Sequence, residues 1–216
     1  MSLGDGSIEY GGRRLKPIIY ENVELGERPT LGYHTIIGES PKGRSHGELP
    51  TRIGSRAVIR SHTVIYAGNQ IGNDFQTGHH VMIREENTIG DYVSIGSGTN
   101  IEHHVVIENG VRIHSLAFVS EYCHLEEGCW LGPKVVLTNA RYPNQADTKN
   151  NLKGVRVCRK AVVGANVTIL PGSIIGPGAV IGAGSVVSCD VPSGAVAYGN
   201  PARIRGKSCD IGYSLD

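Results

Sequence analysis

Aliphatic side chains recur at every sixth position along most of the chain. Steps of six from Ile53 to Leu137 meet fifteen positions, and Thr77 is the one position among them that is not aliphatic. The same period of six occurs before this run, from Ile19 to Ile37, and after it, from Val157 to Val187. The position two residues before each of these is mostly small or aliphatic, and glycine often follows directly. A period of six matches neither the 3.6-residue period of a helix nor the alternation of a flat strand.

The six-residue period is typical of very short strands joined by tight turns. Three hexads close one triangular coil, so 3 × 6 = 18 residues make one coil, and successive coils stack as parallel strands about 4.8 Å apart. The pattern therefore predicts an all-β solenoid with one inward side chain per hexad. We interpret the glycines that follow the inward residues, such as Gly54, as relief of the turn, because glycine tolerates positive φ.

The register of six breaks twice, at residues 39–52 and 138–156, and we expect a loop insertion at each break. Residues 19–190 are predicted to form the solenoid that carries these two loops. Residues 1–18 are expected to be a separate N-terminal segment, in part derived from a cloning vector. Residues 191–216 are expected to form a C-terminal cap and tail.

Composition excludes several classes of function. The 216 residues carry a net charge of +1 and a pI of about 7.7, so no basic field favours nucleic acid as a partner. No apolar stretch approaches a membrane span and no signal peptide is visible, so we expect no membrane and a cytoplasmic location. Five cysteines without paired spacing do not predict a disulfide framework. Cys123 and Cys129 fall at the small inward position, which favours core packing.

The polar residues that stand out gather at one edge of the predicted prism, the third corner, which consists of the turns after Ile65, Ile83, Ile101, Val119 and Leu137. His103 lies there, and Glu85 and Glu121 lie eighteen residues before and after it. His104 is flanked in the same way by Glu86 and Tyr122.

Both predicted loops leave from the third corner as well, and loops are where scaffolds carry function. A carboxylate beside an imidazole fixes the tautomer and favours the charged ring. This corner is therefore the candidate site, with Glu85–His103–Glu121 as its ladder. The alternative is a solvated stack of charges.

The repeat resembles that of the hexapeptide-repeat acyltransferases, which implies a left-handed parallel β-helix. Ile-Glu-His-His at 101–104 is similar to the stretch that carries the general base in the sialic-acid-type and amino-sugar acetyltransferases of this fold. The resemblance implies that His103 is the base, with Glu121 or Glu85 to orient it. His104 departs from the pattern, because those enzymes have an acidic residue there.

A second stretch, Gly132 to Pro143, is similar to a segment of the sugar and antibiotic O-acetyltransferases. Their catalytic histidine would fall at Tyr142, so that version of the mechanism is disfavoured. Nucleotide-amino-sugar N-acetyltransferases also lack this histidine and use a polar residue in the preceding coil. The resemblance adds His114 and Ser115 as candidates and favours an amine acceptor, because an amine needs less help from a base than a hydroxyl.

The C-terminal hexads suggest a site for the acyl donor. Two Gly-Ala pairs repeat at eighteen residues and leave the backbone free of bulk, so the amides of a pantetheine arm can approach. The segment 190–203 is similar to the closing segment of the acetyl-CoA-dependent members, which implies acetyl-CoA as donor, with Arg203, Arg205 and Lys207 near its phosphates. The alternative is that Asn200-Pro201 terminates the solenoid. The candidate donor-binding residues are Gly164, Ala165, Gly182, Ala183, Asn200, Pro201 and Arg203.

The resemblance implies a homotrimer that acetylates a small molecule, most simply the amine of an amino sugar or of its nucleotide-linked form. No metal is expected. Three alternatives stay open: a sugar O-acetyltransferase, a zinc protein like the gamma-type carbonic anhydrases, and a binding subunit without turnover. The zinc alternative would use the histidines of the second corner, His62, His79 and His80.

Overall fold

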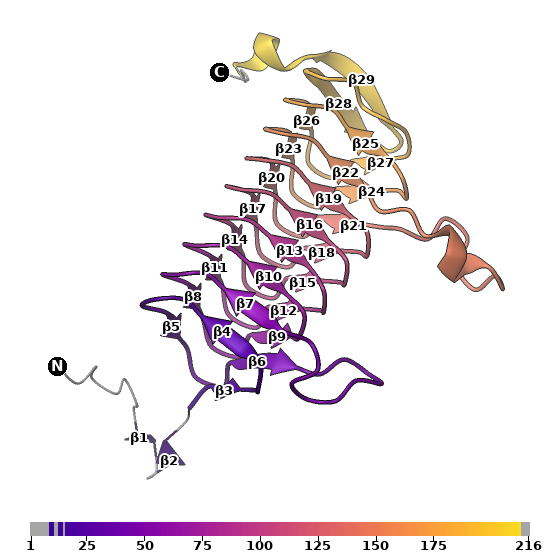
Figure 1. Ribbon diagram of the computed structural model, residues 1–216. Helices are drawn as coiled ribbons and strands as arrows, with labels where there is room; N and C mark the ends of the chain where they lie inside the picture. The colour runs from indigo at the N-terminus through magenta and orange to yellow at the C-terminus, as the bar shows by residue number, and fades with distance from the viewer. Residues whose placement is uncertain (1–8, 11–12, 15, 213–216) are drawn as a thin grey trace.

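Three parallel sheets wind around one axis to form an elongated prism (Figure 1). The computed structural model describes residues 9–10, 13–14 and 16–212. It is an all-β, left-handed parallel β-helix, as the hexapeptide period and the family resemblance predict. Coils are stacked in register eighteen residues apart, as in the series Ile65, Ile83, Ile101 and Val119, and thirty-two residues apart where the second loop intervenes.

The strands are two to four residues long in the coils and are grouped by the face of the prism. Sheet 1 consists of β4 (Val23–Leu25), β7 (Thr51–Ile53), β10 (Gln70–Ile71), β13 (Thr88–Ile89), β16 (Val106–Ile107), β19 (His124–Leu125), β22 (Arg156–Val157) and β25 (Ile174–Ile175). Sheet 2 consists of β5 (Thr30–Leu31), β8 (Val58–Ile59), β11 (Gln76–Thr77), β14 (Ser94–Ile95), β17 (Arg112–Ile113), β20 (Trp130–Leu131), β23 (Val162–Val163), β26 (Val180–Ile181), β28 (Ala195–Gly199) and β29 (Ala202–Lys207). Sheet 3 consists of β3 (Ile18–Ile19), β6 (Ile36–Glu39), β9 (Val64–Tyr66), β12 (Met82–Ile83), β15 (Asn100–Ile101), β18 (Phe118–Val119), β21 (Val136–Leu137), β24 (Thr168–Ile169) and β27 (Val186–Val187). The first, second and third corners are the turns that follow sheets 1, 2 and 3.

The inward residues form one continuous aliphatic core along the axis. From Ile53 to Val187 every position of the six-residue series is at most 5 % exposed, and Cys123 and Cys129 are buried among them. Thr77, the exception in the series, is also buried, and its hydroxyl accepts a hydrogen bond from the Arg60 amide at 3.0 Å. Phe75 is fully buried two residues earlier, at a position that is usually small. A large and a small residue have thus exchanged places in this coil, which keeps the packed volume roughly constant.

Most glycines after the inward residues have a different role from the one predicted, although Gly38 does have a positive φ, of 85°. Gly54 does not have a positive φ; the left-handed residue of that turn is Arg56, with a φ of 60°. A Cβ on Gly54 would lie 2.6 Å from the carbonyl carbon of Gly72 in the next coil. Glycine is therefore required at this position by the close approach of stacked backbones, and the interpretation as relief of the turn was wrong.

We expect Gly54→Ala to destabilise the solenoid by about 1–3 kcal/mol, the usual cost of overpacking. The added methyl group would clash with the backbone of the next coil, which cannot move without disturbing the ladder. Gly206→Ala is the matched control, because its Cβ would meet no atom closer than 3.8 Å. Urea unfolding of both variants checks the prediction. Equal stabilities would contradict the stacking explanation.

The two ends of the solenoid differ. At the N-terminal end Ile19 belongs to the inward series, yet it is 46 % exposed because it lies in the terminal coil. At the C-terminal end β28 pairs in parallel with β26 and then antiparallel with β29, and the 3-10 turn η2 (Ser208–Ile211) follows. The strands β1 (Glu9–Tyr10) and β2 (Arg13–Arg14) pair with each other. Most of the predicted N-terminal segment and the last four residues lie outside the described residues.

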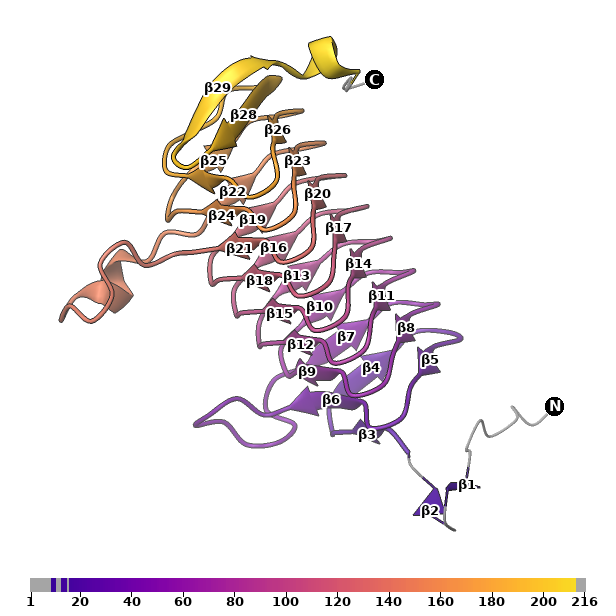
Figure 2. The ribbon, with the colours of Figure 1, turned by 180° about the vertical axis from the view of Figure 1, so that it is seen from behind.

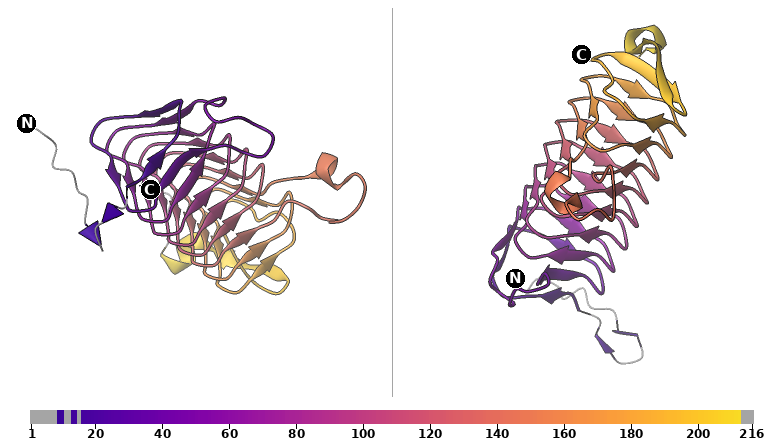
Figure 3. Two further views of the ribbon diagram at one scale, coloured as in Figure 1. Left: turned by 90° about the horizontal axis from the view of Figure 1, so that it is seen from below. Right: turned by 90° about the vertical axis from the view of Figure 1, so that its right-hand side faces the viewer.

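Both insertions project from the same side of the prism (Figure 2). The first joins β6 to β7 through residues 40–50, and the second joins β21 to β22 through residues 138–155 and contains the 3-10 turn η1 (Thr148–Asn151). The second extends further from the coils, as Figure 3 shows from two more directions. Both therefore leave from the third corner, at the two predicted breaks in the register. No helix in the described part of the chain is long and apolar enough to cross a membrane.

Candidate active site

The third corner positions its polar side chains through a repeated turn. In its turns after Ile65, Ile83, Ile101 and Val119 the third residue after the inward one is left-handed, with φ values of 57° at both Glu86 and His104 and 65° at Tyr122. His and Asn tolerate this conformation better than most residues. Because these coils use the same turn, residues eighteen apart project in the same direction and lie one coil apart, about 4.8 Å.

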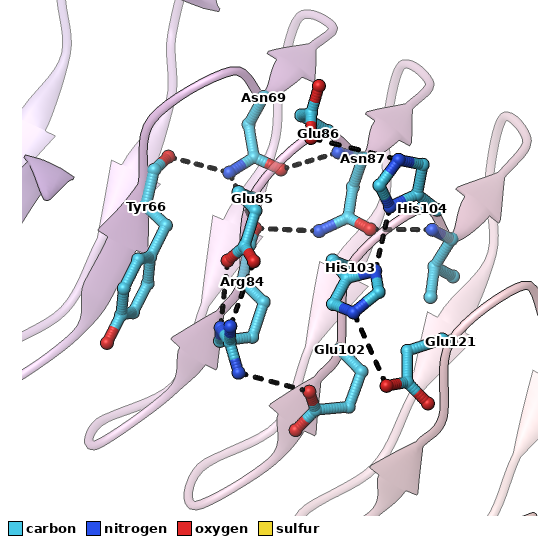
Figure 4. A network of polar contacts seen from close by, with 11 residues as sticks. Tyr66, Asn69, Arg84, Glu85, Glu86, Asn87, Glu102, His103, His104 and Glu121 are labelled. Atoms are coloured by element: carbon cyan, nitrogen blue, oxygen red, sulfur yellow. Dashed lines mark hydrogen bonds and ion pairs between the residues drawn. The ribbon is translucent and has the colours of Figure 1, made fainter. Parts of the chain in front are cut away.

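His103 is held by the following coil. Its Nε2 lies 3.3 Å from Oε1 of Glu121, and the other oxygen of that carboxylate accepts a hydrogen bond from the side-chain amide of Asn139 (Figure 4 shows the His103–Glu121 contact). Both His103 and Glu121 are about one-quarter exposed. The geometry assigns the Nε2 proton of His103 to the bond with Glu121, which leaves Nδ1 as the basic atom.

The Nδ1 of His103 faces the neighbouring imidazole of His104, at 2.7 Å between the two Nδ1 atoms. One ring must donate and the other accept, and the bond to Glu121 makes His104 the donor. His104 in turn has its Nε2 3.7 Å from Glu86, and its ring lies 5.7 Å from that of Tyr122. His104 is nearly half exposed, so an incoming donor group can replace it at Nδ1.

Glu85 does not make the predicted contact with His103. Its carboxylate accepts two hydrogen bonds of 2.8 Å from the guanidinium of Arg84, the residue before it. Arg84 also lies 3.4 Å from Glu102 and its guanidinium carbon 5.3 Å from the centre of the Tyr66 ring. The planar fork of arginine pairs with a carboxylate more strongly than a neutral imidazole does, which accounts for the difference. The ladder is thus reduced to His103 and Glu121.

The pKa values of Glu102 and Glu85 are shifted in opposite directions. Desolvation raises the pKa of Glu102 more than the charge of Arg84 lowers it. Desolvation also acts upward on Glu85, but the hydrogen bonds and charge of Arg84, with a smaller effect of His103, bring the pKa of Glu85 below its usual value. Arg84 therefore compensates the cost of placing two carboxylates in a half-buried corner.

Two buried side-chain amides, those of Asn69 and Asn87, hold the backbone of the third corner through hydrogen bonds. Asn69 and Asn87 are fully buried, and their side chains donate to the carbonyl of Arg84 at 2.8 Å each. The Oδ1 of Asn87 accepts a hydrogen bond of 2.7 Å from the amide of Val105 (Figure 4). These bonds fix the backbone on both sides of the Arg84–Glu85 and His103–His104 turns.

The two loops lie at different distances from His103. The first folds over the terminal coil, where His46 stacks on Tyr20 at 4.2 Å and Asn22 donates to the carbonyl of Gly47. It leaves the corner three coils before His103, about 14 Å away. The second begins two coils after His103, and its Asn139 bonds directly to Glu121. The second loop is therefore the one that contacts the site.

A hollow of about 480 Å³ lies within this second loop. Its walls include Arg141, Asp147, Lys153 and the corner residue Gly172. Tyr142 also lines it and is 65 % exposed.

The other candidate histidines, His62, His79, His80 and His114, lie at the second corner, apart from His103. His114 packs against Trp130, with 4.7 Å between ring centres, and burial together with Arg112 lowers its pKa. His114 and Ser115 share an open hollow of about 330 Å³ with His79. The structure therefore does not bring His114 or Ser115 to the third corner within this chain.

The second-corner histidines of the zinc alternative form a stack. His62 lies 4.6 Å from His80 and 4.9 Å from His34 between ring centres. His79 contacts Ser61 at 2.8 Å. Within the described ranges no group of three or more His, Cys, Asp or Glu side chains is arranged to hold a metal ion.

The residues suggested for the acyl donor lie at the C-terminal end. Gly164 is required by stacking, because its Cβ would lie 2.6 Å from the amide nitrogen of Ala183. A Cβ added at Gly182 would lie 2.7 Å from the Cβ of Tyr198. These two glycines thus have a sufficient structural reason, independent of any ligand. The Ala165 carbonyl accepts from the Gly184 amide and is occupied within the ladder.

The closing segment forms a hairpin between β28 and β29. Asn200 and Pro201 make its turn, and their peptide bond is cis. Arg203 donates to the carbonyl of Ala202, and Arg205 lies over the ring of Tyr198 at 5.6 Å. Both arginines remain exposed at the end of the prism.

One member of the site was not predicted from the sequence, although its spacing marks it. Asn139 lies eighteen residues after Glu121, so the same arithmetic that placed Glu121 beside His103 places Asn139 beside Glu121. It was overlooked because it falls inside the predicted loop.

Known proteins resemble parts of this chain. The family described as "Bacterial transferase hexapeptide (six repeats)" matches residues 154–189. An acyl-[acyl-carrier-protein]–UDP-N-acetylglucosamine O-acyltransferase of Burkholderia lata is 27 % identical over 117 residues, which is 50 % of this chain and 45 % of that protein. A dTDP-3-amino-3,6-dideoxy-alpha-D-galactopyranose 3-N-acetyltransferase of Aneurinibacillus thermoaerophilus is 42 % identical over 59 residues, 27 % of this chain and 31 % of that protein.

Among solved structures, PerB from Caulobacter crescentus in complex with CoA and GDP-perosamine is 26 % identical, with a TM-score of 0.33, and the match covers 64 % of this chain and 57 % of that one. The chain thus spans less than half the length of the two curated relatives. Residues 154–189 match the hexapeptide-repeat family model, and parts of the chain are similar to acyltransferases of sugar nucleotides.

Proposed function

We propose that the chain transfers an acetyl group from acetyl-CoA to a sugar-derived acceptor at the third corner. The observation that carries this proposal is the line from His103 through Glu121 to Asn139, in which a carboxylate holds the imidazole and a loop residue holds the carboxylate. This is the arrangement of a base and its orienting group. Its position beside the second loop supplies a place for an acceptor.

The chemistry is a direct attack on the thioester. The acceptor nitrogen or oxygen binds at Nδ1 of His103 in place of His104 and attacks the acyl carbon. The proton of the acceptor passes to Nδ1, a bond forms from the acceptor to the acyl carbon, and the C–S bond breaks to release the CoA thiolate. Glu121 accepts the hydrogen bond from Nε2–H and stabilises the imidazolium. Backbone N–H groups support the developing oxyanion, and the imidazolium returns its proton to the thiolate.

The amine of an amino sugar, free or nucleotide-linked, is the proposed acceptor. The relative from Aneurinibacillus thermoaerophilus has a name that specifies such an N-acetylation. Tyr142 stands where the O-acetyltransferases of this fold have their histidine. This agrees with an amine acceptor, which needs less help from a general base than a hydroxyl does. The proposed donor site is the C-terminal hairpin, where Arg203 and Arg205 offer positive charge to the phosphates of CoA. We further propose a cytoplasmic homotrimer; a monomeric mass by light scattering would contradict this assembly.

A second candidate uses the same site with another donor and another nucleophile. The relative from Burkholderia lata has a name that specifies an acyl carrier protein as donor and a hydroxyl as acceptor. In that case Nδ1 of His103 removes a hydroxyl proton, and the acyl chain arrives on a carrier protein.

Release of free thiol from acetyl-CoA separates these candidates. The purified chain is incubated with acetyl-CoA or with an acylated carrier protein, each with a panel of amino-sugar nucleotides and their N-acetylated hydroxyl counterparts. We expect thiol release that depends on both acetyl-CoA and a free amine. Release only from the carrier protein with a hydroxyl acceptor would favour the second candidate. Binding of acetyl-CoA without release for any acceptor would favour a subunit without turnover.

A further inference from the structure

Arg84 occupies an unusual place beside the candidate base. Its guanidinium pairs with Glu85 through two bonds of 2.8 Å and reaches Glu102 at 3.4 Å (Figure 4). Glu85 is on the same turn position as Glu121, one coil on the other side of His103. Without Arg84, the carboxylates of Glu85 and Glu102 would lose the cation that pairs with both of them.

The groups that face His103 come from three coils. Its own coil contributes His104 at 2.7 Å and Glu102, whose pKa is raised by burial, an effect partly offset by the charges of Arg84 and His103. The following coil contributes Glu121 at 3.3 Å and Tyr122, with 6.1 Å between ring centres. The preceding coil contributes Glu85, whose pKa His103 also lowers, together with Arg84. Glu86 acts through His104. Arg84 thus pairs with two of the three carboxylates around the His103 imidazole, Glu85 and Glu102, and the third, Glu121, contacts the ring.

The pairing also has a steric side. Glu85 is 9 % exposed and its two oxygens are both engaged by Arg84, so it cannot turn toward the ring of His103. The guanidinium is in turn held against the Tyr66 ring, and the backbone carbonyl of Arg84 accepts from Asn69 and Asn87. The fork is therefore preorganised, which distinguishes it from a mobile surface pair.

We propose that Arg84 is a positioning residue that withholds Glu85 and Glu102 from His103, so that Glu121 alone orients the imidazole. The inference rests on the proposed role of His103 as base. By holding these two carboxylates, Arg84 keeps the His103 ring in one orientation, with Nδ1 free to accept a proton from the acceptor. A carboxylate freed within about 4–6 Å would favour the charged ring and block that role.

The test follows the His103 ring itself, by NMR of protein labelled at the imidazole carbons, assigned with the His103→Ala variant. In Arg84→Met we expect the pH at which the His103 resonances change to move upward by about one unit, the lower end of what a nearby carboxylate causes. In the proposed reaction the acid side of the rate–pH profile moves the same way, with about a tenfold loss of rate near neutral pH. Arg84→Lys keeps the charge but loses the fork, so an intermediate shift is expected.

Two further variants keep the test decisive. Arg56→Met removes an arginine that pairs with Asp74 at the first corner, and it should leave the His103 resonances unchanged. Adding Glu102→Gln to Arg84→Met removes one freed carboxylate and should bring the midpoint back toward that of the wild type. It also reduces the charge that could prevent the single variant from folding.

A folded Arg84→Met protein with an unchanged His103 midpoint would overturn the inference. A lower melting temperature without that shift would mean that Arg84 is only structural. The NMR readout needs no turnover, so absence of acyl transfer in the wild type would count against the proposed function and leave the placement of Arg84 to be judged separately.

Discussion

His103→Ala is expected to lower the rate of acyl transfer about 10²–10⁴-fold, the usual contribution of a general base. The methyl group cannot take the proton of the acceptor, and Glu121 then faces solvent and Asn139 without an imidazole. The effect should fall mainly on kcat, because the base acts in the transition state. Steady-state thiol release with saturating donor measures it.

The matched control is His79→Ala. His79 is also the first of a histidine pair in a turn of the solenoid, but it lies at the second corner and contacts Ser61. We expect its removal to leave the rate within about a factor of two, as for an exposed residue away from the site. If instead His79→Ala abolishes transfer and His103→Ala does not, the active site belongs at the second corner, beside His114.

Ile101→Ala should destabilise the chain by about 2–5 kcal/mol, the typical cost of removing a large buried aliphatic side chain. Ile101 is fully buried in the middle of the prism, between Ile83 and Val119. A cavity there has coils on both sides and cannot be filled by solvent-exposed groups. Urea denaturation followed by circular dichroism measures the loss.

Ile174→Ala provides the comparison for the core. Ile174 precedes an inward residue and is 41 % exposed, so its truncation should cost no more than about 0.5 kcal/mol. A similar cost at both positions would mean that the six-residue phase does not define the core. The phase predicts a large difference between an isoleucine in the inward series and one directly before it.

The fold could be predicted because one geometric unit repeats. Each hexad places one aliphatic side chain inward, so the phase of Ile53, Ile59 and Ile65 determines three sheets and three corners. The stacking of His103 beside Glu121 follows from eighteen residues per coil. The exposure of Ile19 did not follow, because the period carries no information about which coil is the last.

The details of the turns were less accessible. Gly54 was assigned to the wrong role, since a sequence does not distinguish a glycine needed for positive φ from one needed for close approach. The histidine pairs are explained in part by the turn itself, because His80 and His104 occupy its left-handed position. That position tolerates His, so a pair of imidazoles is not by itself a sign of chemistry.

The contacts within the candidate site could not be predicted without the positions of the side chains. Spacing treats Glu85 and Glu121 as equal neighbours of His103, and the structure separates them because Arg84 captures Glu85. Spacing also places both loops at one corner, yet the second one, through Asn139, reaches the His103 network. Competition between partners within a few ångströms decides both points, and a periodic pattern does not encode it.

The most direct measurement is the product itself. Acetyl-CoA and a panel of amino-sugar nucleotides are incubated with the wild-type chain and with His103→Ala, and the acceptors are examined by mass spectrometry. The account predicts an acceptor that gains one acetyl group with the wild type and almost none with the variant. Equal yields of acetylated acceptor from the two proteins would contradict the assignment of His103 and with it the active site at the third corner.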